Sequence, residues 1–404
     1  MSNKLIETIK RRLPEVQEQS DSLREILLSN LVMISEIPSP TFGEADRVHF
    51  LQQRFSECGL QNCSTDEVGN ALGVLPGRDE NRNILVVAHA DTVFSESVDH
   101  TVSVHEQFVT GAGVADDALG LAVLCTLPTL LERLEINLES SLVLMGASRS
   151  LGRGNLEGLR FFLDNNRLPI QAGVCVEGVQ LGRLSLASIG MLRGEIVCRV
   201  SDEYDWTRFG MTSAITTLNE IITRIMEIPI PTRPRTSIVL GSIRGGTSHG
   251  TIARKATLGF EIRSESGEVT RQIAQDMEDR AAEVASQSGS EVDFDIFASR
   301  KPGGVSFSHP MARCTREIMK EFLFPYYQQV ITNLRSRQLD PNRHLYVQVD
   351  TDGYCVPVID WYHEEIGMDV MSPFEVAAGC DVVKVGRDYP WLVMSGGIDK
   401  RVLA

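Results

Sequence analysis

The sequence predicts a two-domain α/β protein, in which a smaller α+β domain is inserted into a larger α/β domain. Its 404 residues exceed what one ordinary hydrophobic core organises. Short apolar runs alternate with amphipathic segments over roughly the first half of the chain, as in α/β domains. From about residue 192 the pattern changes to alternating strands combined with helices, which is typical of a separate α+β domain.

The larger domain is expected to begin with helices over residues 1–36 and 44–58, separated by a Pro-rich break. Apolar and β-branched runs then predict buried strands at 83–90, 141–147 and 172–177. Residues 117–134 are predicted to form a helix despite Pro128. Because these strands alternate with helices, the sheet is expected to be largely parallel.

The inserted domain is expected to span residues 192–299, with strands and helices in the order strand, helix, strand, strand, helix. The segment KPGGVSFSHP, residues 301–310, then returns the chain to the larger domain. The predicted parts of the larger domain are therefore 1–191 and 300–404. No element is predicted for residues 313–370.

Composition and charge exclude several classes of protein. The chain is 42% hydrophobic and 23% charged, close to globular averages, and its net charge of −15 disfavours nucleic acid or an anionic membrane as a partner. No apolar run approaches the roughly 18 residues of a membrane span, and the N-terminus lacks the apolar region of a signal peptide. Eight scattered cysteines are expected to be free thiols, which favours the cytoplasm.

Potential metal-binding side chains follow three of the predicted segments. His89 and Asp91 end the first strand, the pair Asp116-Asp117 ends a Gly-rich loop before a helix, and Glu177 ends the third strand. Open α/β sheets bind ligands at the C-terminal ends of their strands, so these side chains are expected to converge. Residues i and i+2 of a strand share a face, so Asp91 can lie beside His89 and fix its imidazole. One imidazole with two carboxylates suits Zn²⁺ or a similar divalent ion.

Each of these residues also has a structural interpretation. A histidine at a strand end is often a hydrogen-bonded structural residue, and two aspartates before a helix can act as an N-cap. The order and spacing of the set favour the metal site.

The ordered motifs resemble those of the peptidase family M20, which includes acetylornithine deacetylase and peptidase T types. The resemblance covers about residues 20–312 and runs through these motifs: IPSPTFGEAD, DEVGNALGVLPG, VVAHADTVF, GAGVADDALGLA, VEGVQLGRLSLASIGMLRGEI, FGMTSAI, GSIRGGTSHGTIARKATLGFEIRS and KPGGVSFSHP. It implies a zinc-dependent hydrolase of amide or peptide bonds, with the inserted domain acting as a lid that mediates homodimerisation.

The resemblance also assigns roles to residues. In the family, two metal ions share a bridging aspartate, which matches Asp116 and whose following peptide bond is commonly cis. The first ion also takes residues matching His89 and Glu177, and Asp91 matches the residue that orients the histidine. Substrate-binding positions in the lid are matched by Gly250 and Arg263.

The second half of that site is missing from this sequence. The family's Glu-Glu pair, which supplies the general base and a ligand of the second ion, is matched by Arg149-Ser150, or by Ser150-Leu151 if the register shifts by one residue, and neither pair contains a carboxylate. The chain has no histidine after residue 363, where the family places the last metal ligand. Tyr204 occupies the position of the lid histidine that polarises the substrate carbonyl, and Gly250 that of a usual asparagine.

These departures predict at most one bound zinc ion and impaired hydrolysis, because losing a general base alone costs about 10²–10⁴-fold. Arg149 either points inward and compensates the carboxylates or faces solvent. Three hypotheses remain: a one-metal hydrolase of small amides or peptides, a non-catalytic ligand-binding or scaffold protein, and a metal-free cleft in which Arg149 pairs with Asp116 and Glu177.

Overall fold

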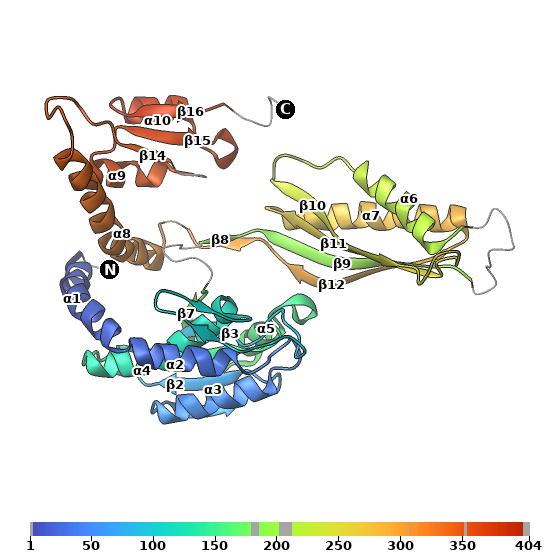
Figure 1. Ribbon diagram of the computed structural model, residues 1–404, viewed down its shortest axis with the longest axis horizontal. Helices are drawn as coiled ribbons and strands as arrows, with labels where there is room; N and C mark the ends of the chain where they lie inside the picture. Colours follow the sequence, from blue (N-terminus) through green and yellow to red (C-terminus); the bar gives the residue numbers. More distant parts are fainter. Residues whose placement is uncertain (1–2, 179–185, 202–211, 307, 351–353, 399–404) are drawn as a thin grey trace. The chain divides into compact units, whose positions relative to one another are not determined.

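The computed structural model describes residues 3–178, 186–201, 212–306, 308–350 and 354–398. The chain divides into two compact units, one formed by residues 13–306 and the other by residues 1–12 together with 307–404. The N-terminal helix α1, Asn3–Ser22, includes the boundary between them. Figure 1 shows the elements of each unit.

The α/β domain of the first unit is built on a five-stranded sheet of order β1-β2-β6-β3-β7. The strands are β1 (Gln61–Thr65), β2 (Ala71–Leu75), β3 (Asp79–His89), β6 (Ser140–Ala147) and β7 (Ile170–Cys175). β6, β3 and β7 are parallel, as predicted, but β2 and β1 join antiparallel at the β6 edge. The expectation of a largely parallel sheet therefore holds only for the half of the sheet that carries the predicted site.

Helices cover this sheet and bury its aliphatic strands (Figure 1). They are α2 (Arg24–Ser35), α3 (Ala45–Glu57), α4 (Leu119–Arg133) and α5 (Glu157–Asn165), with short turns η1 (Val114–Ala118) and η2 (Gly152–Gly154). Leu51 and Phe55 of α3 and Leu121 of α4 are fully buried in the same core as strands β3 and β6. A short hairpin of β4 (Ser103–Val104) and β5 (Val109–Thr110) precedes η1.

One segment, Val114–Arg133, is long and apolar enough to cross a membrane, although no such run was expected from the sequence. Half of it is buried inside the protein, and the inward residues of α4 pack in the core described above. These contacts are those of a core helix.

The inserted domain is a four-stranded antiparallel sheet of order β10-β11-β9-β12 with two helices on one face. Its elements are β9 (Gly190–Arg199), α6 (Ala214–Met226), β10 (Thr236–Gly245), β11 (Lys255–Ser264), α7 (Gly267–Ser288) and β12 (Glu291–Arg300). Alternate residues of β9 and β11, such as Ile196 and Phe260, pack against α6 and α7, and the residues between them face the open side. The fourth strand, β12, was not predicted. Small strands β8 (Ala187–Ser188) and β13 (Gly303–Gly304) pair beside this domain.

The second unit contains the residues for which the sequence predicted no structure. Its elements are α8 (Pro310–Ser336), β14 (Gln348–Asp350), η3 (Val356–Val358), α9 (Ile359–Ile366), β15 (Val370–Phe374), η4 (Val376–Ala378), α10 (Val382–Asp388) and β16 (Val393–Gly396). The three strands form a parallel sheet of order β14-β15-β16 with its own apolar core. The assignment of residues 300–404 to the metal-binding domain, like the exact boundaries of the inserted domain, stays a prediction.

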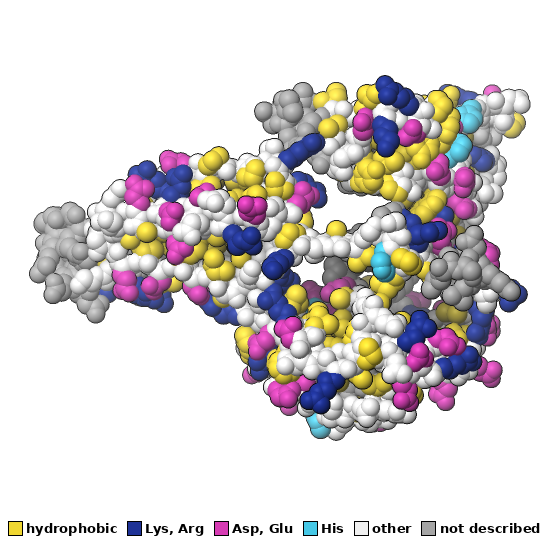
Figure 2. Space-filling model, turned by 180° about the vertical axis from the view of Figure 1, so that it is seen from behind, with side chains coloured by type: hydrophobic (Ala, Val, Ile, Leu, Met, Phe, Trp, Pro, Cys, Tyr) yellow, Lys and Arg dark blue, Asp and Glu magenta, His cyan; other side chains and the backbone are white. Residues whose placement is uncertain are grey.

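The surface shows no large basic area on the face seen in Figure 2, where Lys and Arg side chains alternate with Asp and Glu. All eight cysteines are free thiols. Two of them, Cys355 and Cys380, lie with their sulfur atoms 3.8 Å apart in the buried core of the second unit.

Candidate functional site

Three of the predicted metal ligands meet at the C-terminal ends of the parallel strands. His89 is the last residue of β3, Glu177 follows β7 by two residues, and Asp116 lies in the turn η1 before α4. One ligand atom from each of these side chains lies within 4.8 Å of the other two. The convergence follows from topology, because adjacent parallel strands end at the same edge of the sheet.

His89 is held by contacts at both ring nitrogens. Its Nε2 lies 2.8 Å from Oδ1 of Asp116, and its Nδ1 lies 2.8 Å from the backbone carbonyl oxygen of Asp91. The Asp91 carboxylate is farther, with Oδ1 3.5 Å from Nδ1. Asp91 therefore orients the imidazole as expected from its position, but mainly through its backbone carbonyl. With Nδ1 donating to that carbonyl, Nε2 is the atom left to bind a metal ion.

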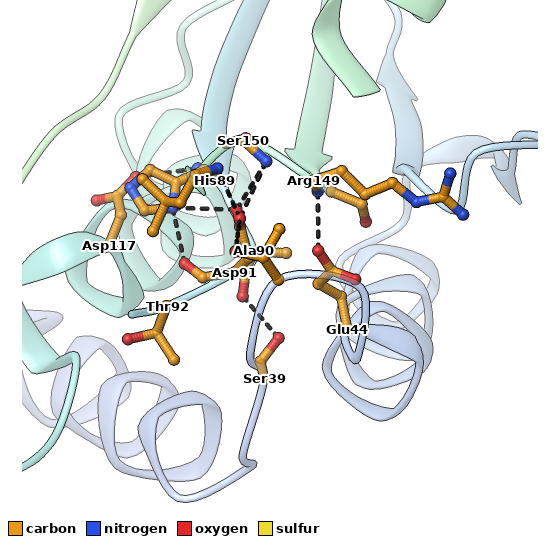
Figure 3. A network of polar contacts seen from close by, with 12 residues as sticks. Ser39, Glu44, His89, Ala90, Asp91, Thr92, Asp117, Arg149 and Ser150 are labelled. Atoms are coloured by element: carbon orange, nitrogen blue, oxygen red, sulfur yellow. Dashed lines mark hydrogen bonds and ion pairs between the residues drawn. The ribbon is translucent and has the colours of Figure 1, made fainter. Parts of the chain in front are cut away.

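The carboxylate of Asp91 binds the loop after β6 instead. It is completely buried and accepts backbone N–H bonds from Ser150 (3.0 and 3.1 Å) and Leu151 (2.8 Å). It also accepts a hydrogen bond of 2.8 Å from the hydroxyl of Thr41. Figure 3 shows how these contacts bring the loop at residue 150 against the end of β3. A single buried anion thus connects three segments that are distant in sequence.

Asp117 anchors the turn that presents Asp116. The peptide bond between the two residues is cis. The Asp117 side chain is fully buried and accepts N–H bonds of 3.1 Å from both His89 and Gly120. A Cβ at position 120 would lie 2.3 Å from an Asp117 carboxylate oxygen, so only glycine fits there. Asp117 is therefore a structural member of the Asp pair, and Asp116 is the member whose carboxylate faces His89.

The cluster carries more negative than positive charge, and this shifts its pKa values. Burial acts to lower the pKa of His89, but the interaction with Asp91 and the charges of Asp117 and Glu177 outweigh it and raise that pKa to about 9. Burial raises the pKa of Asp117 to about 7, against the opposing effect of His89. Burial also raises the pKa of Glu177; His89 opposes this shift and the charge of Asp116 adds to it.

These properties fit a divalent cation. A neutral imidazole nitrogen and two carboxylate oxygens are ligands that Zn²⁺ accepts, and three protein ligands leave coordination positions open. With its pKa raised to about 9, His89 retains a proton at neutral pH when no cation is bound. A bound cation would supply the missing positive charge.

Arg149 does not supply that charge. Its Nη1 lies 2.8 Å from Oε1 of Glu157, and its guanidinium lies over the ring of Phe42, 5.7 Å from the centroid. Figure 3 shows the side chain extending away from His89 and Asp117. Its backbone N–H donates to the buried carboxylate of Glu44, and its φ of +53° turns the loop there. The hypothesis that Arg149 points inward is wrong, and the solvent-facing alternative describes the structure.

Two other arginines contact the site and were not found from the sequence. Arg47 of α3 is fully buried and donates to the carbonyl oxygens of Ala90 (3.0 Å) and Ile37 (2.5 Å). Burial lowers its pKa to about 10, and the charge of Asp91 opposes this shift. The sequence did contain a signal for the burial of Arg47. Arg47, Leu51 and Phe55 are spaced four residues apart, which places them on the same buried face of the helix. Arg300, at the end of β12, donates to the carbonyl of Ser150 at 3.0 Å.

The predicted residues of the inserted domain are not all placed with this cluster. Arg263 lies on β11, half-exposed, and pairs with Glu261. Gly250 lies in the loop between β10 and β11 with a φ of +72° and open space around it. Tyr204 falls outside the described residues. The substrate-binding roles of Gly250 and Arg263 and the position of Tyr204 stay predictions.

Comparison with known proteins identifies the class to which this fold belongs. Residues 208–288 match the family model of the peptidase dimerisation domain, M20_dimer. No curated protein sequence matches the chain. The match identifies residues 208–288, within the inserted domain, as a dimerisation domain of the kind described for M20 peptidases.

Solved structures with the same fold are peptidases of low sequence identity. The dipeptidase Dug1p from Saccharomyces cerevisiae is 12% identical, with a TM-score of 0.61 over 90% of this chain and 91% of that one. Human carnosine dipeptidase 1 is 10% identical, with a TM-score of 0.59 over 90% and 92%. The aminopeptidase PepT from Bacillus cereus is 17% identical, with a TM-score of 0.54 over 77% and 82%. At these identities the likeness concerns the fold.

Replacing Asp91 by Asn should lower the free energy of unfolding by about 1–3 kcal/mol, because an amide cannot accept all three groups that now donate to the buried carboxylate. Urea unfolding of the metal-free protein measures this change. The control is Thr41→Val, which removes only the hydroxyl donor and should cost less. Equal stability of Asp91→Asn and wild type would contradict the proposed link between the loop and β3.

Proposed function

We propose that this protein is an M20-type amide or peptide hydrolase that has kept one metal site and has lost most of its hydrolytic activity. His89, Asp116 and Glu177 would hold one divalent cation, most simply Zn²⁺. The ligand would be a small molecule with an amide or peptide bond. The observation that carries the proposal is the convergence of these three donors beside a loop with no carboxylate at positions 149 and 150.

In this proposal, each residue around the cation has a distinct task. The cation, when bound, supplies Lewis-acid polarisation of a carbonyl oxygen or a coordinated water. The Asp91 carbonyl keeps Nε2 of His89 directed at the cation position, and Asp117 holds the turn that presents Asp116. Because the pKa of His89 is raised to about 9, its imidazole would lose a proton near neutral pH as the cation enters.

The reduced activity follows from the state of the neighbouring carboxylates. A general base must have a free lone pair within hydrogen-bond reach of the proton that it removes. Asp91, Asp117 and Glu44 each use carboxylate oxygens to accept backbone N–H bonds. The hydroxyl-bearing side chain of Ser150 is buried, and an unactivated hydroxyl is a poor base. Among these described neighbours, none replaces the lost pair.

The alternative is a non-catalytic M20 homologue that binds a ligand or acts as a scaffold. The missing general base supports this alternative equally. The non-catalytic homologue differs from the one-metal hydrolase only in having no residual turnover. The third hypothesis, a metal-free cleft closed by Arg149, is not proposed, since Arg149 pairs with Glu157 instead.

Protein purified without chelators should contain close to one equivalent of zinc per chain, because three ligands serve one ion and a second set is missing from the sequence. Inductively coupled plasma mass spectrometry measures the content after dialysis. The variant His89→Ala should lose most of it, whereas His363→Gln, whose ring stacks on Trp391, should retain it. Two equivalents per wild-type chain would contradict the one-metal site, and none would contradict metal binding.

Hydrolysis of N-acyl amino acids and dipeptides by the zinc-loaded protein should give kcat/KM below about 10⁴ M⁻¹s⁻¹. Active enzymes commonly have kcat/KM of about 10⁴–10⁸ M⁻¹s⁻¹, and the loss of the general base lowers the rate by about 10²–10⁴-fold. Quantifying the released amine measures the rate, and His89→Ala gives the background. Turnover in the ordinary enzyme range would contradict the loss of activity. A rate equal to that of His89→Ala would favour the non-catalytic alternative.

We propose further that the inserted domain mediates a homodimer and that the protein is cytoplasmic. The homodimer is supported by the matched dimerisation domain, and the cytoplasmic location by the eight free thiols. Sedimentation equilibrium should give twice the chain mass of 44.7 kDa. A mass of one chain at micromolar concentration would contradict the dimer.

A further inference from the structure

The inserted domain carries a cavity of about 820 Å³ that shares no residue with the His89 cluster. It lies at the ends of β10 and β11 and the loop that joins them. Glu195 of β9 and Arg153 of η2 complete its wall. The size is within the range of small-molecule sites, about 300–1,000 Å³.

The charge of this cavity is opposite to that of the whole protein. Four basic side chains line it, and one acidic side chain, Glu195, faces them; the basic residues are Arg153, Arg244, Arg254 and Lys255. The chain as a whole has a net charge of −15. A local excess of positive charge in a concave wall attracts anions, because the field is focused there and water screens it less than on a flat surface.

Arg244 is only weakly paired in this wall. Oε2 of Glu195 lies 2.8 Å from Nη2 of Arg153, which also lies near Asp295, with Nη1 3.4 Å from Oδ2. The other oxygen of Glu195, Oε1, lies 3.8 Å from Nη2 of Arg244, which is a long contact. The Arg244 side chain is also 74% exposed and able to turn toward a ligand.

The positive charge of Lys255 is compensated even less than that of Arg244. Its direct neighbour on β9 is Arg199, a like charge on the same face of the sheet. Arg199 pairs with Asp293, away from Lys255. Within the part of the chain that the structure describes, Lys255 makes no ion pair. Hydroxyl groups of Thr247, Thr251 and Thr257 line the same space and can donate to anionic oxygens.

We propose that this cavity binds a compact dianion, whose two negative charges Arg244 and Lys255 would contact from neighbouring strands. A guanidinium pairs with carboxylate or phosphate oxygens through a planar fork, and a lysine adds a point charge. The shared chemistry is two anionic groups within a few ångströms, as in a dicarboxylate or a phosphate. This site depends on neither metal binding nor hydrolysis.

Calorimetric titration of the full-length protein with succinate and, separately, with inorganic phosphate tests the proposal. At about 20 mM salt at least one dianion should bind with Kd below about 1 mM, and acetate at least tenfold more weakly. Binding should weaken at least tenfold in Arg244→Gln/Lys255→Gln and at physiological salt. The control Arg224→Gln/Arg235→Gln removes the same two charges from pairs with Glu220 and Glu265 outside the cavity, and should change Kd less than twofold.

The variant His89→Ala distinguishes this cavity from the metal cluster. If the dianion binds to a cation held by His89, the variant should lose binding; if it binds in the cavity, binding should remain. Both exposed substitutions should leave the melting temperature unchanged, which excludes unfolding as the cause of weaker binding. Tighter binding of phosphate would assign the ligand to phosphorylated compounds, and tighter binding of succinate to dicarboxylates. Failure of both dianions to bind, or equal binding by the double variant, would overturn the proposal.

Discussion

The buried carboxylate of Asp91 is the interaction on which the site depends. A buried charge is tolerated only when its lone pairs are satisfied, and here three donors from two loops surround it. The fully buried Arg47 adds a compensating positive charge and ties two carbonyls beside it. The backbone carbonyl of Asp91 also orients His89. One residue therefore holds the loops together through its carboxylate and fixes the imidazole through its carbonyl.

In the proposed one-metal site, this arrangement would hold the three retained residues in place without the second set of ligands. His89, Asp116 and Glu177 are held by strand ends and by Asp117, none of which requires a carboxylate at position 149 or 150. The loop at 149–151 is instead secured through its backbone: Glu44 and Asp91 accept its N–H groups, and Arg300 donates to its carbonyl. These backbone contacts hold the loop without any metal-binding side chain at positions 149 and 150.

The two faces of the sheet in the inserted domain have different roles. One face of the sheet buries aliphatic side chains against α6 and α7 and gives the domain its stability. The other face carries paired charges, including Arg193 with Glu261 and Arg199 with Asp293. At the end of β10 and β11 the pairing becomes incomplete, which makes this part of the face suited to a charged ligand.

The sequence alone determined the positions of the parallel strands and the identity of the three side chains that converge at their ends. Local periodicity defines strands β3, β6 and β7, and strand ends in a parallel sheet have only one edge at which to meet. The inserted domain was also visible as a change in pattern, although β12 was missed, and the antiparallel strands β1 and β2 were not predicted.

Only the tertiary structure decided where individual side chains point and which atoms they bind. The solvent-facing direction of Arg149 depends on Glu157 and Phe42, and the burial of Arg47 depends on carbonyls from two other segments. The preference of His89 for the carbonyl rather than the carboxylate of Asp91 arises because the loop at 150–151 occupies that carboxylate. Periodicity specifies which face of an element is buried. Some of these contacts join nearby residues, such as Arg149 and Glu157, but others join segments 43 to 105 residues apart, and no local pattern encodes those.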